Sequence, residues 1–306
     1  MNARTIFTKN LRWIDIPEPT AEDIKWLEAN FRFHQLHYEA VREKQQRPRL
    51  DAGRGYDFLV LLFPVYDQKN QEIVSGEVDF FISQNFVITV HYNQIHTINK
   101  IFAAIKNGAG VRAANMQKGS GFLLYKILEG LFQRSYPILD HMNEDIGAIE
   151  QGIFRDTGAN MLSKIMLMKK NIIEFRKMMK THRSVLEKLP KRTSEYFNFA
   201  QSKLYYRDLL EYYENIWDIL EALKETADGL ADTNQALVAR RLGETTKIIS
   251  VFSAIVIPAT LVAFLFGVSV EGIPFRYNPH GFWLVAILMA LASLITLWIF
   301  KRNKWF

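Results

Sequence analysis

The chain contains no cysteine, which excludes disulfide frameworks, iron–sulfur clusters, thiolate zinc sites and cysteine nucleophiles. It also lacks the composition of a disordered or collagen-like protein, because 49% of its residues are hydrophobic and only 16 of the 306 are glycine. Neither sign of charge dominates, since 38 basic against 32 acidic side chains leave a net charge of +6 and a pI near 9.3. That mild excess is compatible with a membrane surface or with weak nucleic-acid binding, and it decides between neither.

Motifs of enzyme chemistry are also missing. The sequence shows no Walker loop, no dinucleotide fingerprint and no nucleophile–base arrangement. Two histidine pairs, His34 with His37 and His91 with His96, lack the third ligand and the spacing of a recognised zinc site. We therefore expect a protein that is not an enzyme and has no cofactor, with its histidines packed in the core or at the surface.

Charged residues are absent from two long segments near the C-terminus. Residues 248–266 and 282–300 each run for 19 positions without a charge. As a helix, each segment would be roughly 28 Å long, close to the ~30 Å thickness of the hydrocarbon layer of a bilayer. The sequence therefore predicts two transmembrane helices rather than two buried helices of a soluble core.

Basic residues flank this pair of segments on one side of the predicted membrane. They are Arg240, Arg241, Lys247, Lys301, Arg302 and Lys304. The link at 267–281 contains Glu271 and Arg276 as its only acidic or basic residues besides His280. By the positive-inside rule, both termini should be cytoplasmic and the link periplasmic, in a bacterial inner membrane.

The N-terminal part of the chain alternates between strand and helix patterns. Predicted strands are 11–16, 56–63, 77–82 and Phe86–His91, and predicted helices are Ala21–Asn30, capped by Thr20, and 95–106. Residues 1–118 are therefore predicted to form a cytoplasmic α/β layered domain.

Helical patterns dominate the rest of the chain. We expect a helical stalk at 119–245, in which Pro137 bends or divides a helix and Pro190 interrupts one. From Arg192 into the first apolar segment, a single helix would have about 75 residues, and such a helix needs partners along its length. The transmembrane domain would follow at 246–306. The predicted fold is thus an α+β membrane protein.

The first apolar segment carries a stripe of small polar residues. The stripe consists of Thr246, Ser250, Ser253, Ile257 and Thr260, spaced 4, 3, 4 and 3 residues apart. This is the period of a helix-packing seam, which favours either a pore lining or ordinary packing of transmembrane helices through small residues. Two spans cannot enclose a water-filled path alone, so a pore would require symmetric copies of the chain.

Three parts of the C-terminal region resemble the CorA-type magnesium transporter family, including its zinc-transporting ZntB branch. They are the stretch LGETTKIISVFSAIVIPATLVAFLFGVSVEGIPF, the second apolar segment and the ending KRNKWF. Similarity extends upstream to YYRD at 205–208, WIDI at 13–16 and NFVITVH at 85–91. The resemblance implies a homopentameric funnel whose first spans line a pore for Mg²⁺ or a related divalent cation. It implies the lipid bilayer and divalent cations as partners, and no nucleic acid.

The resemblance also assigns the outer mouth of the pore. The family's Gly-Met-Asn triplet is Gly267, Val268 and Ser269 here, and Glu271 stands where the family often has an acidic residue. Serine has a shorter arm than asparagine, so its ring would be wider and would hold a hydrated ion more weakly. This leaves two alternatives open: a zinc transporter like ZntB, favoured by the loop sequence Gly-Ile-Pro, and a weakly selective channel or membrane-stress protein. Glu271 itself has a simpler alternative role, an ion pair with Arg276.

Asp208 corresponds to an aspartate that contributes to a regulatory metal site between subunits in the family. The resemblance therefore assigns a regulatory divalent cation to Asp208. The alternative is an ordinary solvated ion pair with the neighbouring Arg207.

Overall fold

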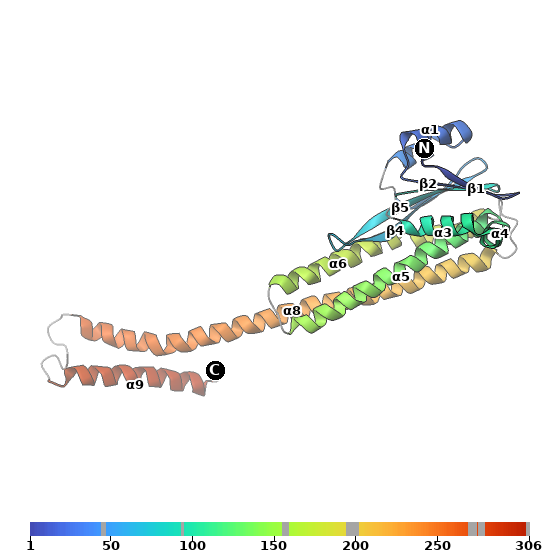
Figure 1. Ribbon diagram of the computed structural model, residues 1–306. Helices are drawn as coiled ribbons and strands as arrows, with labels where there is room; N and C mark the ends of the chain where they lie inside the picture. The colour runs from blue at the N-terminus through green and yellow to red at the C-terminus, as the bar shows by residue number, and fades with distance from the viewer. Residues whose placement is uncertain are drawn as a thin grey trace. The chain divides into compact units, whose positions relative to one another are not determined.

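The computed structural model describes residues 1–43, 47–92, 95–154, 159–193, 202–268, 274 and 279–303. It divides into two compact units, Met1–Ala231 and Asp232–Phe306 (Figure 1). Helix α8 (Ser202–Gly267) contributes residues to both units. The sequence analysis places the start of this long helix at Arg192, but Arg192 belongs to α7, and α8 as described begins at Ser202 and has 66 residues.

The first unit contains a six-stranded sheet with the order β1-β2-β6-β5-β4-β3. The strands are β1 (Arg4–Phe7), β2 (Arg12–Pro17), β3 (Arg49–Ala52), β4 (Asp57–Asp67), β5 (Glu72–Ile82) and β6 (Phe86–His91). Only the β2–β6 pair is parallel; the other pairs are antiparallel. The four predicted strands are present, and β6 has the predicted bounds. The short edge strands β1 and β3 have no counterpart among the predictions.

One face of the sheet is covered by α1 (Ala21–Asn30) and α2 (Gln35–Arg42). Helix α1 begins where the sequence predicts, because Thr20 and Asp23 form a capping box. The Asp23 carboxylate accepts from the Thr20 backbone N–H at 3.0 Å, and the Thr20 hydroxyl accepts from the Asp23 N–H at 3.3 Å. Ile24 and Leu27 are buried in the same core cluster as Phe81 of β5.

Further helices of this unit lie on the opposite face, where α5 and α6 pack directly on β4 (Figure 1). The helices of this group are α3 (His96–Asn107), α4 (Ala109–Met116), α5 (Ser120–Ile153), α6 (Ala159–Met179) and α7 (His182–Thr193). Trp13 meets Phe102 of α3 edge-on, with the ring centroids 4.9 Å apart. On α6, the buried Asn171 accepts from the Ile73 N–H at 3.0 Å, which joins this helix to β5.

Two prolines lie inside helices. Pro137 lies inside α5 without dividing it, and that helix continues to Ile153. Pro190 lies inside α7, so the predicted interruption there is wrong. An internal proline costs about 3 kcal/mol of helix stability, but Leu186 and Leu189 of α7 are fully buried and hold the helix against the rest of the unit.

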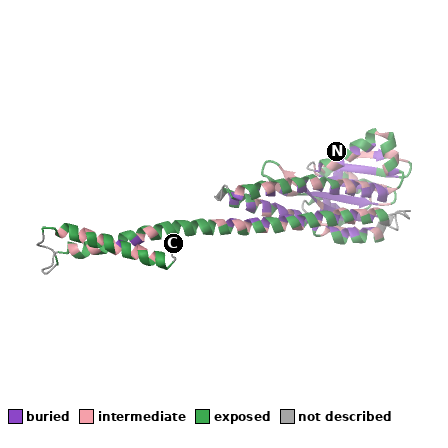
Figure 2. Ribbon diagram, turned by 90° about the horizontal axis from the view of Figure 1, so that it is seen from below, coloured by how far each residue is buried: buried purple, intermediate pink, exposed green. Residues whose placement is uncertain are grey.

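In the second unit, the end of α8 is accompanied by α9 (Gly281–Arg302). Both helices contain stretches with a mean hydropathy of 2.5 and 2.4, long enough to cross a membrane. Only 6% and 0% of these stretches are buried in the chain, and Figure 2 colours most of their residues as exposed. In a soluble protein, helices this apolar would be buried in the core. Their exposure therefore favours the predicted membrane spans at 248–266 and 282–300.

Candidate ion pathway

The predicted stripe lies on the part of α8 that belongs to the second unit. Thr246, Ser250, Ile257 and Thr260 are exposed, and Ser253 is half-buried. Ile257 keeps 65% of its surface exposed although it is a large apolar side chain in the middle of the segment. The stripe is therefore a surface that this chain does not cover with its own side chains.

Hydroxyl groups of the stripe bond back to their own helix. Thr246 donates to the Leu242 carbonyl at 2.8 Å, Ser250 donates to the Thr246 carbonyl at 2.8 Å, and Thr260 donates to the Val256 carbonyl at 2.7 Å. A hydroxyl has one proton and two lone pairs, so each oxygen keeps only acceptor capacity for a further partner. The stripe thus presents acceptor oxygens, which suit a cation or the outward-pointing protons of its hydration water.

Helix α9 packs beside this stripe. The Ser293 hydroxyl donates to the Ile255 carbonyl at 2.7 Å, and Ala254 is buried next to it. Between the two helices runs an open groove of about 790 Å³, lined by Thr296 and Phe300 of α9 and by four residues of the stripe, Thr246, Ser250, Ser253 and Ile257. Most of the stripe therefore borders an open groove beside the second span.

The predicted outer mouth is described only in part. Gly267 is the last residue of α8, and Val268 follows it with half of its surface exposed. Among the described residues, apart from its chain neighbours and its own helix backbone, a Cβ atom added to Gly267 would meet no atom within 4 Å. Ser269 and Glu271 lie outside the described residues.

Asp208 lies in the first unit, on the part of α8 that packs against α5. Its Oδ2 accepts from the Tyr125 hydroxyl at 2.8 Å, and the same hydroxyl lies 2.8 Å from Glu129 Oε1. Burial, together with the bonds to these carboxylates, raises the pKa of Tyr125 well above its ordinary value. In the part of the chain that the structure describes, Asp208 forms no ion pair, so the alternative of a pair with Arg207 is not seen there.

The sequence analysis did not predict that Tyr125 and Glu129 would lie beside Asp208. A tyrosine hydroxyl has one proton and donates to only one of the two carboxylates at a time. Glu129 also pairs with Lys126 at 2.6 Å, which compensates part of the negative charge. The spacing of Tyr125 and Glu129 by four residues places them on one face of α5, but no sequence signal indicates that this face meets Asp208.

The histidines have packing roles. The His34 ring accepts from the Leu36 N–H at 3.2 Å at the start of α2, and His37 stacks on Phe58 with the ring centroids 4.5 Å apart. His91 is buried 3.3 Å from the Asp15 carboxylate. Among the described residues, no group of three or more histidines and carboxylates could hold a metal ion.

Residues 8–302 match the family described as CorA-like Mg²⁺ transporter protein. The cobalt/magnesium transport protein CorA of Thermotoga maritima is 23% identical over 275 residues, which cover 90% of this chain and 77% of that protein. The zinc transport protein ZntB of Yersinia pseudotuberculosis is 20% identical over 296 residues, covering 96% and 87% of the two chains.

The fold agrees with this family match. The complete structure of the CorA magnesium transporter from Methanocaldococcus jannaschii superposes with a TM-score of 0.81 at 21% identity, over 98% of this chain and 94% of that one. This agreement includes the α/β sheet domain, the long helix and both apolar helices, so the predicted α+β fold class and the predicted resemblance are confirmed. The family match spans nearly the whole sequence, and this chain therefore belongs to the CorA-like Mg²⁺ transporter protein family.

Proposed function

We propose that this chain forms a homopentameric channel that passes Mg²⁺ or a related divalent cation through a bacterial inner membrane. The observation that carries the proposal is family membership over residues 8–302, joined to two exposed apolar helices. The basic residues beside the spans support an orientation with both termini in the cytoplasm. The relatives reported above are transporters, in agreement with the expectation that the chain is not an enzyme.

The stripe on α8 supports its role as the pore lining. Its hydroxyl oxygens accept hydrogen bonds and their protons are already used within the helix. Because Mg²⁺ loses its hydration water reluctantly, a path lined by acceptors suits an ion that moves with part of its water shell. Transport would follow the electrochemical gradient, because no nucleotide-binding motif supplies another source of energy.

Five copies of the chain would complete this path. The stripe is exposed in one chain, and two spans cannot surround water, so symmetric neighbours would provide the remaining walls. The number five comes from the family resemblance.

Asp208 is our candidate for a regulatory divalent-cation ligand. It is half-buried, and its neighbours Tyr125 and Glu129 bring further oxygen atoms to the same place. Oxygen ligands are those that Mg²⁺ prefers. A carboxylate of a neighbouring subunit would add the charge that a single chain does not provide.

Flux assays in liposomes test the transport proposal. We expect purified protein to admit Mg²⁺ more rapidly than K⁺ when an inward gradient is applied, and protein-free liposomes serve as the control. If no divalent cation enters faster than in the control, the proposal is wrong.

A zinc transporter is the second candidate, supported by similarity to ZntB over 96% of this chain. In the same assay, Zn²⁺ entry without Mg²⁺ entry would favour it. Comparable fluxes of Mg²⁺, Co²⁺ and K⁺ would instead identify a weakly selective channel, the outcome expected if Ser269 does not discriminate among hydrated ions.

A further inference from the structure

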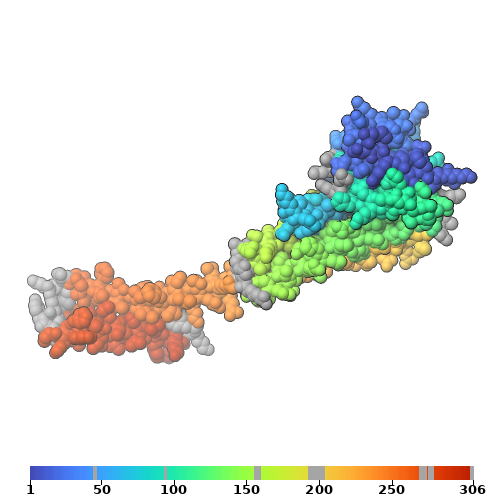
Figure 3. All heavy atoms as spheres, in the orientation of Figure 1, coloured from blue at the N-terminus to red at the C-terminus, as the bar shows by residue number. Residues whose placement is uncertain are grey.

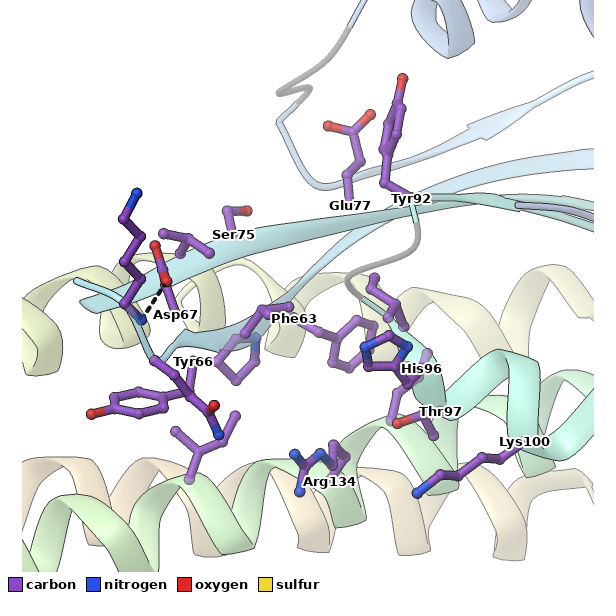
Figure 4. A pocket seen from close by; sticks show the side chains of 18 of the residues that line it. Phe63, Tyr66, Asp67, Ser75, Glu77, Tyr92, His96, Thr97, Lys100 and Arg134 are labelled. Atoms are coloured by element: carbon purple, nitrogen blue, oxygen red, sulfur yellow. Dashed lines mark hydrogen bonds between the residues drawn. The ribbon is translucent and has the colours of Figure 1, made fainter. Parts of the chain in front are cut away.

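A cavity of about 1130 Å³ opens in the first unit where β4 and β5 face the start of α3 and the middle of α5 (Figure 4). Figure 4 shows two sides of this cavity. Glu77 and Tyr92 project from the sheet on one side, whereas His96, Lys100 and Arg134 lie on the side of the helices. Helices α3 and α5 pack side by side (Figure 3). Lys100 of α3 and Arg134 of α5 therefore belong to one wall of the cavity (Figure 4).

The charges on the helical wall are available to a ligand. Lys100 and Arg134 are exposed, and among the described residues neither forms an ion pair or a hydrogen bond. By contrast, Lys126 on the same helix as Arg134 is paired with Glu129 at 2.6 Å. Two unpaired cations from two packed helices create a local positive potential at this wall.

The start of α3 adds hydrogen-bond donors beside these cations. His96 and Thr97 form its first turn and line the cavity, and the residue before them, Ile95, provides no side-chain cap. The first backbone N–H groups of this 12-residue helix therefore have no side-chain acceptor at the cap position, and the helix dipole is positive at this end. The Thr97 hydroxyl provides one more polar group.

Three carboxylates, those of Glu18, Asp67 and Glu77, also line the cavity, and none of them comes from α3 or α5. Asp67 is engaged in its own turn, where it accepts from the Lys69 N–H at 3.0 Å and from the Asn70 side chain at 2.7 Å. Glu77 projects from the sheet, across the cavity from Lys100 and Arg134 (Figure 4). Leu131 and Ile138 of α5 add apolar surface on the helical side, and Phe63 of β4 adds apolar surface on the side of the sheet.

We propose that this wall binds the phosphate group of a small phosphorylated molecule. An arginine and a lysine together match the charge and the several oxygens of a phosphate, and the apolar surface beside them accommodates an organic body. The cavity volume is sufficient for a ligand of nucleotide size. This site is separate from the stripe on α8, and the proposal does not depend on whether the chain transports ions.

Binding calorimetry on the full chain in detergent tests the proposal. The probes are pyrophosphate, ADP and adenosine, in buffer with excess EDTA so that no metal ion bridges a probe to the protein. We expect pyrophosphate and ADP to bind and adenosine alone not to bind. If neither phosphate compound binds at millimolar concentration, or if adenosine binds as well as ADP, the proposal is wrong.

A double variant locates the site. Lys100→Gln with Arg134→Gln should weaken ADP binding at least about tenfold, since a charge-assisted contact commonly contributes that much. The control is Lys25→Gln with Lys106→Gln, which removes the same charge from exposed positions that do not line the cavity. Circular dichroism melting verifies that both variants are folded. An equal loss of affinity in both variants would show a nonspecific charge effect and would refute the site.

Discussion

At the scale of single residues, burial decides the behaviour of His182 on α7. Its ring is fully buried and packs against Phe63 and Phe132, with ring centroids 5.2 and 5.7 Å away. Burial lowers the pKa of His182 from 6.5 to about 4, because the charged imidazolium would lose its hydration. The folded protein therefore keeps this histidine neutral at pH values where the unfolded chain already binds a proton.

Stability should consequently depend on pH through this residue. Between pH 6.5 and pH 4 the unfolded state binds more protons than the folded state, so stability falls as the pH is lowered through this range. The full effect is roughly 3 kcal/mol, from a pKa difference of about 2.5. We expect His182→Phe to flatten the decline of the thermal midpoint between pH 7 and pH 4. Parallel curves for the variant and the wild type would contradict this assignment.

Ser269 stands at the proposed outer mouth of the pore, where the family's Gly-Met-Asn triplet has asparagine. Ser269→Asn should restore longer carbonyl arms, each contributing roughly 0.5–1.5 kcal/mol through bonds to the hydrated ion. Five of them would raise the Mg²⁺/K⁺ flux ratio tenfold or more, since about 1.4 kcal/mol is a factor of ten. A narrowed mouth would instead reduce the flux of every ion equally. An unchanged ratio at unchanged total flux would show that Ser269 does not face the ion.

At the scale of elements, the contact between α5 and α8 sets the environment of Asp208. Removing the Tyr125 hydroxyl by Tyr125→Phe would leave Asp208 without this donor, so its carboxylate would be more available to a cation, whereas Glu129 would keep its ion pair with Lys126. We expect the Mg²⁺ concentration that half-protects the protein from proteolysis to fall by about fivefold, the equivalent of one hydrogen bond of ~1 kcal/mol. Asp208→Asn should raise that concentration.

A second tyrosine between the same helices provides the matched control. The Tyr212 hydroxyl accepts from the Gln133 side chain at 3.1 Å, and within the described part of the chain it is not bonded to Asp208. Tyr212→Phe should leave the protective Mg²⁺ concentration unchanged. If Tyr125→Phe and Asp208→Asn behave like this control, Asp208 is not a regulatory ligand.

The stripe on α8 and the outer surface of α9 should differ in their access to water. We expect cysteines placed at Ser253 and Thr260 to react with membrane-impermeant thiol reagents, whereas a cysteine at Leu288 of α9 should face lipid and remain unreactive. The chain has no native cysteine, so the labelling reports only the introduced position. Equal labelling at all three positions would mean that the stripe does not line a pore.

At the scale of the whole molecule, the proposed pore depends on assembly. Among the described residues, the second unit leaves most of the stripe and most of its apolar surface exposed. We expect mass measurement in mild detergent to find five copies, because symmetric neighbours are what turn one open groove into a closed path. A monomer or dimer as the sole species would remove the basis for the pore.

The sequence by itself determined those features whose signals are local. The two apolar helices follow from uncharged length, and α1 follows from the Thr20 cap together with its helical spacing. Strand β6 follows from an apolar run between turn residues. Family membership also follows from the order of short motifs along the chain.

Only the tertiary structure decided which of these elements meet. Pro190 remains inside α7 because Leu186 and Leu189 are buried against other parts of the unit, and this gain outweighs a local cost. The bond from Tyr125 to Asp208 joins residues 83 positions apart, and the wall formed by Lys100 and Arg134 requires α3 to lie beside α5. Such pairings depend on the register and packing of distant segments, which periodicity and capping signals within a single segment do not encode.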